Sequence, residues 1–316
     1  AVFRREADWG RAVGRADLID PRLLFCLSED QTVAEELALL SLKFGEHILE
    51  ENNRFELVIE DESDLAGLPE SVIKSSAQTA GERGHAGKWV FTLHKPSFIP
   101  FLTYAENRAL REKIFEAYIN RGNHDDELDT KNMIKRMVAL RLKRAVLLGY
   151  ETHADYVLEK NMAGNPEAVY DFLHSLWKPA LKNAAREAQE LQAQIRKEGH
   201  TFKLEPWDWW YYAEKLKQDK YALDDNLLRP YFQLENVRRG AFDVASQLFG
   251  VSFEPRNDLP VYHPDVRAFE VKDNDGSHIG ILYTDYFPRS SKRGGAWMNA
   301  FRKQSRLNGV AQSPII

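Results

Sequence analysis

The sequence predicts a mainly α-helical protein with a small antiparallel β region near its C-terminal end. Over the first two-thirds of the chain, apolar residues recur mostly at the three- and four-residue spacing of amphipathic helices. From residue 251 onward, short strand-like runs separated by turn-forming residues replace that pattern. The 316 residues, 43% of them hydrophobic and 29% charged, are enough for about two globular domains.

Local signals predict where the helices begin and end. Residues 32–35 (Thr-Val-Ala-Glu) match a capping box, in which the Thr and Glu side chains bond free backbone N–H groups, so we expect a helix to start there. Asn165 and Pro166 suit the cap and the first position of a long helix that Gly199 would end. Further helices are expected over residues 107–120, 129–148, 208–217 and 235–248.

Two pairs of short apolar runs are expected to form strands. Residues 56–59 and 89–93 would pair within the helical region, and residues 266–271 and 279–286 would form a hairpin around the turn sequence Lys-Asp-Asn-Asp-Gly. Residues 296–301 are a candidate third strand. We therefore predict a helical lobe with a short β-hairpin over residues 1–204, and a second domain of helices followed by a β-sheet over residues 205–316.

Composition argues against several classes of protein. A net charge of −5 provides no general attraction to nucleic acid or to anionic membranes. No apolar run approaches the roughly 18–20 residues of a membrane span, and the N-terminal residues do not read as a signal peptide. Cys26 is the single cysteine, which rules out a disulfide framework and favours a reducing compartment.

The common catalytic motifs are absent. The chain contains no H-E-x-x-H metal motif, no G-x-S-x-G and no phosphate-binding glycine loop. His263 and His278 flank a predicted strand, but isolated histidines usually satisfy local hydrogen bonds, so we do not expect them to bind a metal. Residues 273–276 resemble half of a calcium loop and are better explained as a turn.

Five aromatic residues fall within residues 206–212. One interpretation is an aromatic platform for a peptide or a base. The other, which we favour, is the start of a helix, with Asp208 as its cap and the rings buried against neighbouring helices.

A basic, glycine-containing segment is the strongest candidate for ligand binding. Between residues 289 and 306 the sequence has six basic residues and no acidic residue, in a chain that is acidic overall. Either this segment is a solvated surface, or its cations hold a carboxylate-bearing ligand. Gly294 and Gly295 remove side chains where another backbone can approach, as when a peptide adds to a strand edge. The candidate peptide-binding residues are Lys292, Arg293, Gly294, Gly295 and Ala296.

Three long stretches carry a family resemblance. Residues 107–173 (NRALREKIFEAYINRG…NPEAVYDFL), 206–253 (PWDWWYYAEKLKQDKYALDDNLLRPYFQLENVRRGAFDVASQLFGVSF) and 261–298 (VYHPDVRAFEVKDNDGSHIGILYTDYFPRSSKRGGAWM) resemble zinc metallopeptidases of the thimet oligopeptidase family, particularly its bacterial peptidyl-dipeptidase branch. The resemblance implies a helical, clam-shaped, zincin-like peptidase with a central channel. It also implies that a zinc-bound water attacks the peptide bond with a glutamate as general base, and that dipeptides leave from the C-terminus of short peptides.

The zinc-binding residues that the resemblance implies have no match here. In the family, H-E-F-G-H and the other metal and transition-state residues follow the region corresponding to Ile316, so no catalytic or metal-ligating residue can be assigned in this chain. Both ends of the sequence read as internal. We therefore expect a segment that stops before the zinc helix, binds no zinc, is inactive alone and needs a C-terminal zinc-binding half as partner. A non-catalytic peptide-binding or scaffold protein and one half of a split peptidase remain alternatives. A cytoplasmic location is expected, with the periplasm as the alternative.

Overall fold

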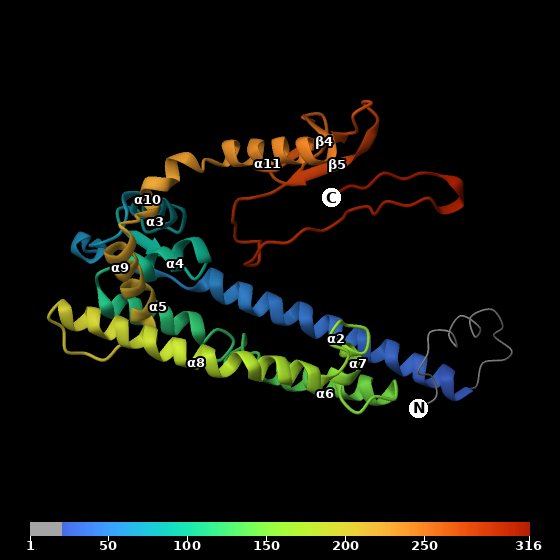
Figure 1. Ribbon diagram of the computed structural model, residues 1–316, viewed down its shortest axis with the longest axis horizontal. Helices are drawn as coiled ribbons and strands as arrows, with labels where there is room; N and C mark the ends of the chain where they lie inside the picture. The colour runs from blue at the N-terminus through green and yellow to red at the C-terminus, as the bar shows by residue number, and fades with distance from the viewer. Residues whose placement is uncertain (1–20) are drawn as a thin grey trace. The chain divides into compact units, whose positions relative to one another are not determined.

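The computed structural model describes residues 21–316 and divides them into two units, one ending at Lys220 and one spanning Tyr221–Ile316. The fold is mainly helical with small antiparallel sheets, as the sequence predicts (Figure 1). The predicted domain boundary at 204/205 falls before the helix Trp209–Tyr221, most of which belongs to the first unit. No helix in the described part of the chain combines the length and apolarity needed to cross a membrane.

The described residues of the first unit form helices and one two-stranded sheet. Its elements are α2 (Pro21–Arg54), β1 (Leu57–Ile59), η2 (Glu62–Leu65), α3 (Glu70–Glu82), β2 (Trp89–Phe91), α4 (Lys95–Tyr104), α5 (Arg108–Ile119), α6 (Lys131–Leu147), α7 (His153–Leu158), α8 (Pro166–Lys197), η3 (Pro206–Asp208) and α9 (Trp209–Tyr221). Strands β1 and β2 pair antiparallel, which confirms the predicted pairing of these two runs.

Helices α3 and α4, which the sequence did not clearly indicate, help to bury this sheet. Leu57, Phe91, Phe101 and Ile114 from the strands, α4 and α5 form a single buried cluster, each at most 1% exposed. Helix α4 forms although Pro100 lies inside it. Tertiary burial of its apolar side chains therefore overrides a local sequence that disfavours a helix.

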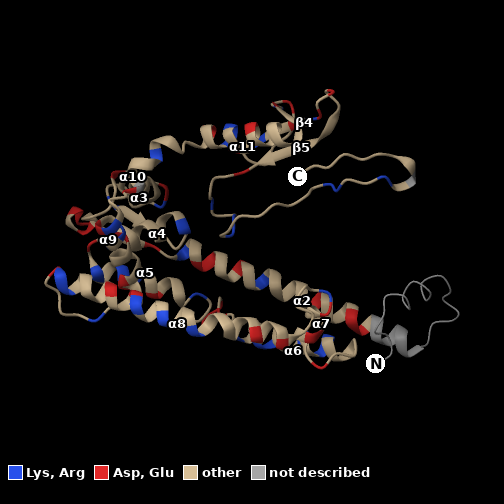
Figure 2. Cartoon of the chain, viewed as in Figure 1, with Lys and Arg blue, Asp and Glu red and all other residues tan. Residues whose placement is uncertain are grey.

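The expected helix start at Thr32 is wrong. Helix α2 already begins at Pro21 and continues through residues 32–35. The Thr32 hydroxyl donates to the carbonyl of Ser28, one turn back, instead of capping a free N–H group. Helix α2 packs along α6, where Arg136 pairs with Glu36 and Arg144 with Asp30, and Figure 2 shows both signs of charge along the two helices.

Helix α8 follows the predicted signals at both ends. The Asn165 side chain accepts the N–H of Ala168, and Pro166 occupies the first turn. At the other end the chain reverses at Gly199, whose φ is +83°, and the N–H of His200 donates to Ile195. Glycine tolerates this left-handed conformation, which explains why the helix ends there.

The second unit consists of helices followed by a three-stranded sheet. Its elements are α10 (Asp225–Leu228), η4 (Arg229–Tyr231), α11 (Leu234–Phe249), β3 (Ser252–Pro255), β4 (Arg267–Lys272), β5 (His278–Thr284) and η5 (Leu307–Gly309). The strand order is β3-β4-β5, all antiparallel, and the predicted β4–β5 hairpin is confirmed. Phe242 of α11 stacks on Phe253 and contacts Phe269 edge-on, which joins the helix to the sheet.

The expected third strand over residues 296–301 is wrong. The third strand is β3, which pairs with β4, while residues 296–300 have no regular structure. The outer edge of β5 is instead paired with the last residues of the chain, through a parallel bridge between Ile281 and Ile315. Residues 301–316 fold back on themselves, with Arg302 opposite Ile315 and Ser305 opposite Gln312. We call residues 301–316 the C-terminal ribbon.

Candidate peptide-binding segment

The turn after β5 is held together by one aspartate. Asp285 accepts two hydrogen bonds from the Arg289 guanidinium, at 2.9 and 2.7 Å, and lies 2.8 Å from the Lys292 ammonium. Hydrogen bonds from Arg289 hold the pKa of Asp285 well below its usual range. The Lys292 ammonium also donates to the carbonyls of Asp285 and Phe287, both at 2.9 Å. Two cations of the basic segment therefore share one carboxylate, which offsets one of their two positive charges.

Of the remaining four cations, one is hydrogen-bonded within the chain and three have no acidic partner among the described residues. The Arg302 guanidinium donates to the Ser313 carbonyl at 2.9 Å and stabilises the C-terminal ribbon. Arg293, Lys303 and Arg306 have no acidic partner among the described residues, and Figure 2 shows blue without red along this part of the chain. Among the predicted site residues, Arg293 is therefore the side chain whose positive charge is available to a ligand.

The predicted glycine pair lies open. Gly294, Gly295 and Ala296 are exposed, and a Cβ added at either glycine would meet no atom within 4 Å. Gly295 has a backbone φ of +118°, which residues other than glycine rarely adopt. The backbone of Gly294 is not in this region, so a side chain there would not be strained. Nothing in the described chain uses the space beside these two residues.

In the second unit, Gly280 inside β5 is the glycine that admits a neighbouring backbone. A Cβ at this position would lie 2.8 Å from the Pro314 carbonyl oxygen. Beside it, the Ile281 N–H donates to Pro314 at 3.1 Å and the Tyr283 N–H donates to Ile316 at 2.7 Å. The sequence analysis missed this contact, although a glycine in the middle of a strand is a signal of close backbone approach.

The histidines of the second unit are engaged locally, as expected. Nδ1 of His278 lies 2.8 Å from Glu270 and Nε2 lies 3.1 Å from the Ser313 hydroxyl. His263 lies 3.5 Å from Asp265. Residues 21–316 include no cluster of three His, Cys, Asp or Glu side chains that could hold a metal ion.

The aromatic segment is mainly structural, which supports the second interpretation above. Tyr211 and Tyr212 are buried against Leu191 and Ile195 of α8. Beside them, Leu204, Glu205, Pro206, Trp209 and Trp210 line an open hollow of about 470 Å³ with Ala188.

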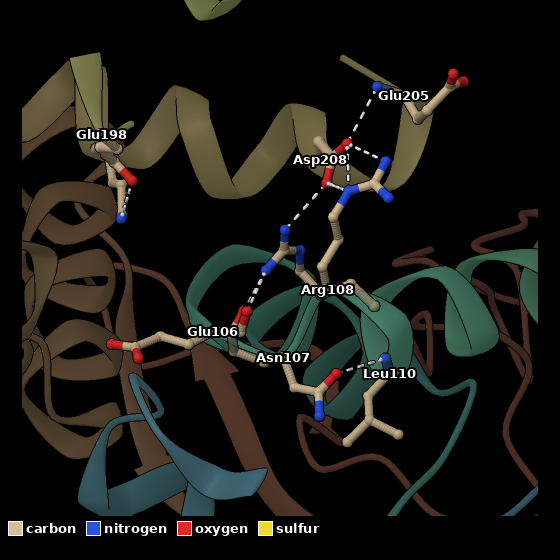
Figure 3. A network of polar contacts seen from close by, with 10 residues as sticks. Glu106, Asn107, Arg108, Leu110, Glu198, Glu205 and Asp208 are labelled. Atoms are coloured by element: carbon tan, nitrogen blue, oxygen red, sulfur yellow. Dashed lines mark hydrogen bonds and ion pairs between the residues drawn. The ribbon is translucent and has the colours of Figure 1, made fainter. Parts of the chain in front are cut away.

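Asp208 does not cap the helix as expected, because it is the last residue of η3, whose cap position is occupied by Glu205. Asp208 is fully buried, accepts the Glu205 N–H at 3.1 Å and is bonded by two arginines of α5 (Figure 3). Arg108 reaches it at 2.9 Å and Arg111 at 3.0 Å. Because Arg111 is itself only 1% exposed, the carboxylate compensates a buried positive charge and ties the start of α9 to α5.

Comparison with known proteins places the chain among peptidases. The family description "Peptidase family M3" matches residues 101–316. The chain belongs to peptidase family M3, which confirms the resemblance drawn from the sequence.

Several curated relatives cover most of the chain. It is 40% identical over 274 residues to a dipeptidyl carboxypeptidase of Escherichia coli K12, covering 86% of this chain and 40% of that protein. It is 36% identical over 288 residues to an oligopeptidase A of Haemophilus influenzae, covering 90% of this chain and 42% of that protein. An organellar oligopeptidase A of Arabidopsis thaliana is 36% identical over 297 residues, covering 91% of this chain and 37% of that protein. The chain thus spans well under half the length of these relatives.

Proposed function

We propose that this chain is part of a zinc-dependent peptidyl-dipeptidase or oligopeptidase that releases dipeptides from the C-terminus of short peptides. The observation that carries the proposal is the 40% identity to a dipeptidyl carboxypeptidase within peptidase family M3. In this proposal residues 205–316 are the start of the catalytic-type domain, and the chain supplies a wall of the peptide channel. A cytoplasmic location fits the single cysteine, and a periplasmic location is the alternative.

The described residues do not fit a zinc site. Their His, Cys, Asp and Glu side chains form no cluster of three, and the whole 316-residue sequence has no H-E-x-x-H motif. We therefore propose that zinc is held by a C-terminal half outside these residues, and we assign no catalytic step to them. By itself the chain should hydrolyse no peptide.

The proposed substrate contacts are the five residues that the sequence singled out. The exposed backbone of Gly294, Gly295 and Ala296 can pair with an extended peptide, because no neighbouring atom fills the space beside the two glycines. Arg293 can meet a substrate carboxylate. Lys292 would not contact the substrate directly. Its ammonium is hydrogen-bonded to the turn that precedes the two glycines, and it would hold that turn in place.

The primary test has a genetic and a biochemical part. Reading the gene beyond Ile316 should reveal H-E-x-x-H within about a hundred residues, and the longer polypeptide should bind zinc and release C-terminal dipeptides. An in-frame stop codon near Ile316 and no cleavage by a stable, peptide-binding monomer would instead establish the non-catalytic alternative. If a separate chain restores zinc uptake and cleavage on mixing, the protein is a split peptidase.

The substrate contacts are tested in the longer polypeptide. Gly294→Val should raise KM for peptides about tenfold or more while zinc content stays unchanged, because a side chain there blocks peptide approach without backbone strain. Arg293→Gln should also raise KM, and Lys303→Gln is the matched control on the ribbon. Loss of zinc or of folding in Gly294→Val, before any change in KM, would show that the glycine is structural.

A further inference from the structure

The first half of α8 exposes a row of large apolar side chains. Each of the following residues is at least 50% exposed: Tyr170, Phe172, Leu173, Leu176, Trp177 and Leu181. At 100° per residue they share one side of the helix, while Asp171, Ser175 and Lys182 lie on the opposite side. We call these six residues the open face. A patch of this kind marks a protein interface more often than a solvated surface.

The same helix shows how such a row is covered. Further along α8, Leu191 is 3% exposed and Ile195 is 0% exposed, because Tyr211 and Tyr212 of α9 pack onto them. The open face continues that apolar stripe toward the start of the helix, but no described element buries it. An apolar helix face of a partner would complete the stripe in the same way.

We propose that the open face is the docking surface for the remaining part of a family M3 polypeptide, which packs an apolar face against α8. Two observations favour this occupant. The family match includes all of α8, and the matched relatives hold more than half of their length outside the region that corresponds to this chain. The inference rests on the proposed function, because it assumes that this chain works together with the rest of such a polypeptide.

The test is binding between this chain and the portion of the E. coli dipeptidyl carboxypeptidase that follows its matched region. The two are produced separately, mixed, and followed by calorimetry and by size-exclusion chromatography with light scattering. The test variant is Leu173→Glu with Trp177→Glu, and the matched control is Lys182→Glu, on the opposite side of α8. Because all three side chains are exposed in the separate chain, each variant should retain the wild-type helical circular dichroism.

The wild type and Lys182→Glu should bind that portion equally, and the double variant should bind at least tenfold more weakly. Equal binding by all three chains, or no binding by the wild type, overturns the inference. Self-association that the double variant abolishes would also overturn it, since the occupant would then be a second copy. Binding that depends on the open face without any zinc-dependent cleavage would leave the inference standing and refute the proposed function.

Discussion

The two halves of α8 both carry apolar side chains along one side of the helix, but these side chains lie in opposite environments. In the covered half, Leu191 and Ile195 pack under α9 and are almost inaccessible to water. In the open half, residues 170–181, larger apolar side chains are at least half exposed. An amphipathic pattern therefore establishes that a helix has a side to bury, but not what buries it. The second unit shows the same contrast. Gly280 contacts another backbone whereas Gly294 does not, and Arg289 is paired with an acid whereas Arg293 is not.

The largest loss of stability is expected at Asp208, whose ion pairs join the segment before α9 to α5. Asp208→Ala should lower the free energy of unfolding by about 3–5 kcal/mol, because it leaves the buried Arg111 without a counter-charge. Asp219→Ala, which removes the more exposed pair between Asp219 of α9 and Lys197 of α8, should cost much less. Urea titration compares the two variants. Similar losses would show that Asp208 has no special role.

The second prediction compares the two halves directly. Ile195→Ala should cost about 2–5 kcal/mol because it leaves a cavity under α9. Leu173→Ala should change the stability of this chain by no more than about 0.5 kcal/mol. Thermal and urea unfolding of both variants provide the measurement. A large loss for Leu173→Ala would mean that the open face is already covered in this chain.

The third prediction applies the contrast to two glycines. Gly280→Ala should cost about 1–3 kcal/mol, because the new methyl group would force the Pro314 carbonyl away from β5. Gly294→Ala, with open space around it, should be neutral within about 0.5 kcal/mol. Hydrogen exchange should show faster exchange of the Ile281 and Tyr283 amides in Gly280→Ala alone. Unchanged exchange would contradict the pairing of the C-terminal ribbon with β5.

The smallest effect on stability is expected at the ion pairs of Asp285, and it depends on pH. The pKa of Asp285 is lowered in the folded chain, so on acidification the unfolded state takes up this proton first. The stabilisation is complete above the unfolded pKa of about 3.9 and decreases as the pH falls below it. Asp285→Asn should therefore be less stable than the wild type by up to about 1 kcal/mol at pH 7, and the difference should shrink toward pH 3.

Urea midpoints at several pH values provide this measurement. Arg293→Gln, which changes a cation with no acidic partner among the described residues, should follow the wild type at every pH. A difference between Asp285→Asn and the wild type that grows on acidification would contradict the assigned ion pairs.

The sequence predicted the elements whose signals lie within a few residues. Asn165 and Gly199 mark the two ends of α8 because caps involve backbone groups three or four positions away. The β4–β5 hairpin was predictable because its turn sequence joins neighbouring strands. Helix α4 was not, since Pro100 opposes it locally and burial among residues distant in sequence stabilises it.

For the candidate site, the sequence alone determined the family resemblance, the basic segment and the absence of a zinc motif. Only the tertiary structure decided that Asp285 pairs with both Arg289 and Lys292, whereas Arg293 has no acidic partner among the described residues. It also decided that Gly280 rather than Gly294 faces another backbone. Composition and spacing specify which groups a segment carries. Which charges are balanced, and which faces are covered, depends on contacts between residues far apart in the chain, and these exist only once it has folded.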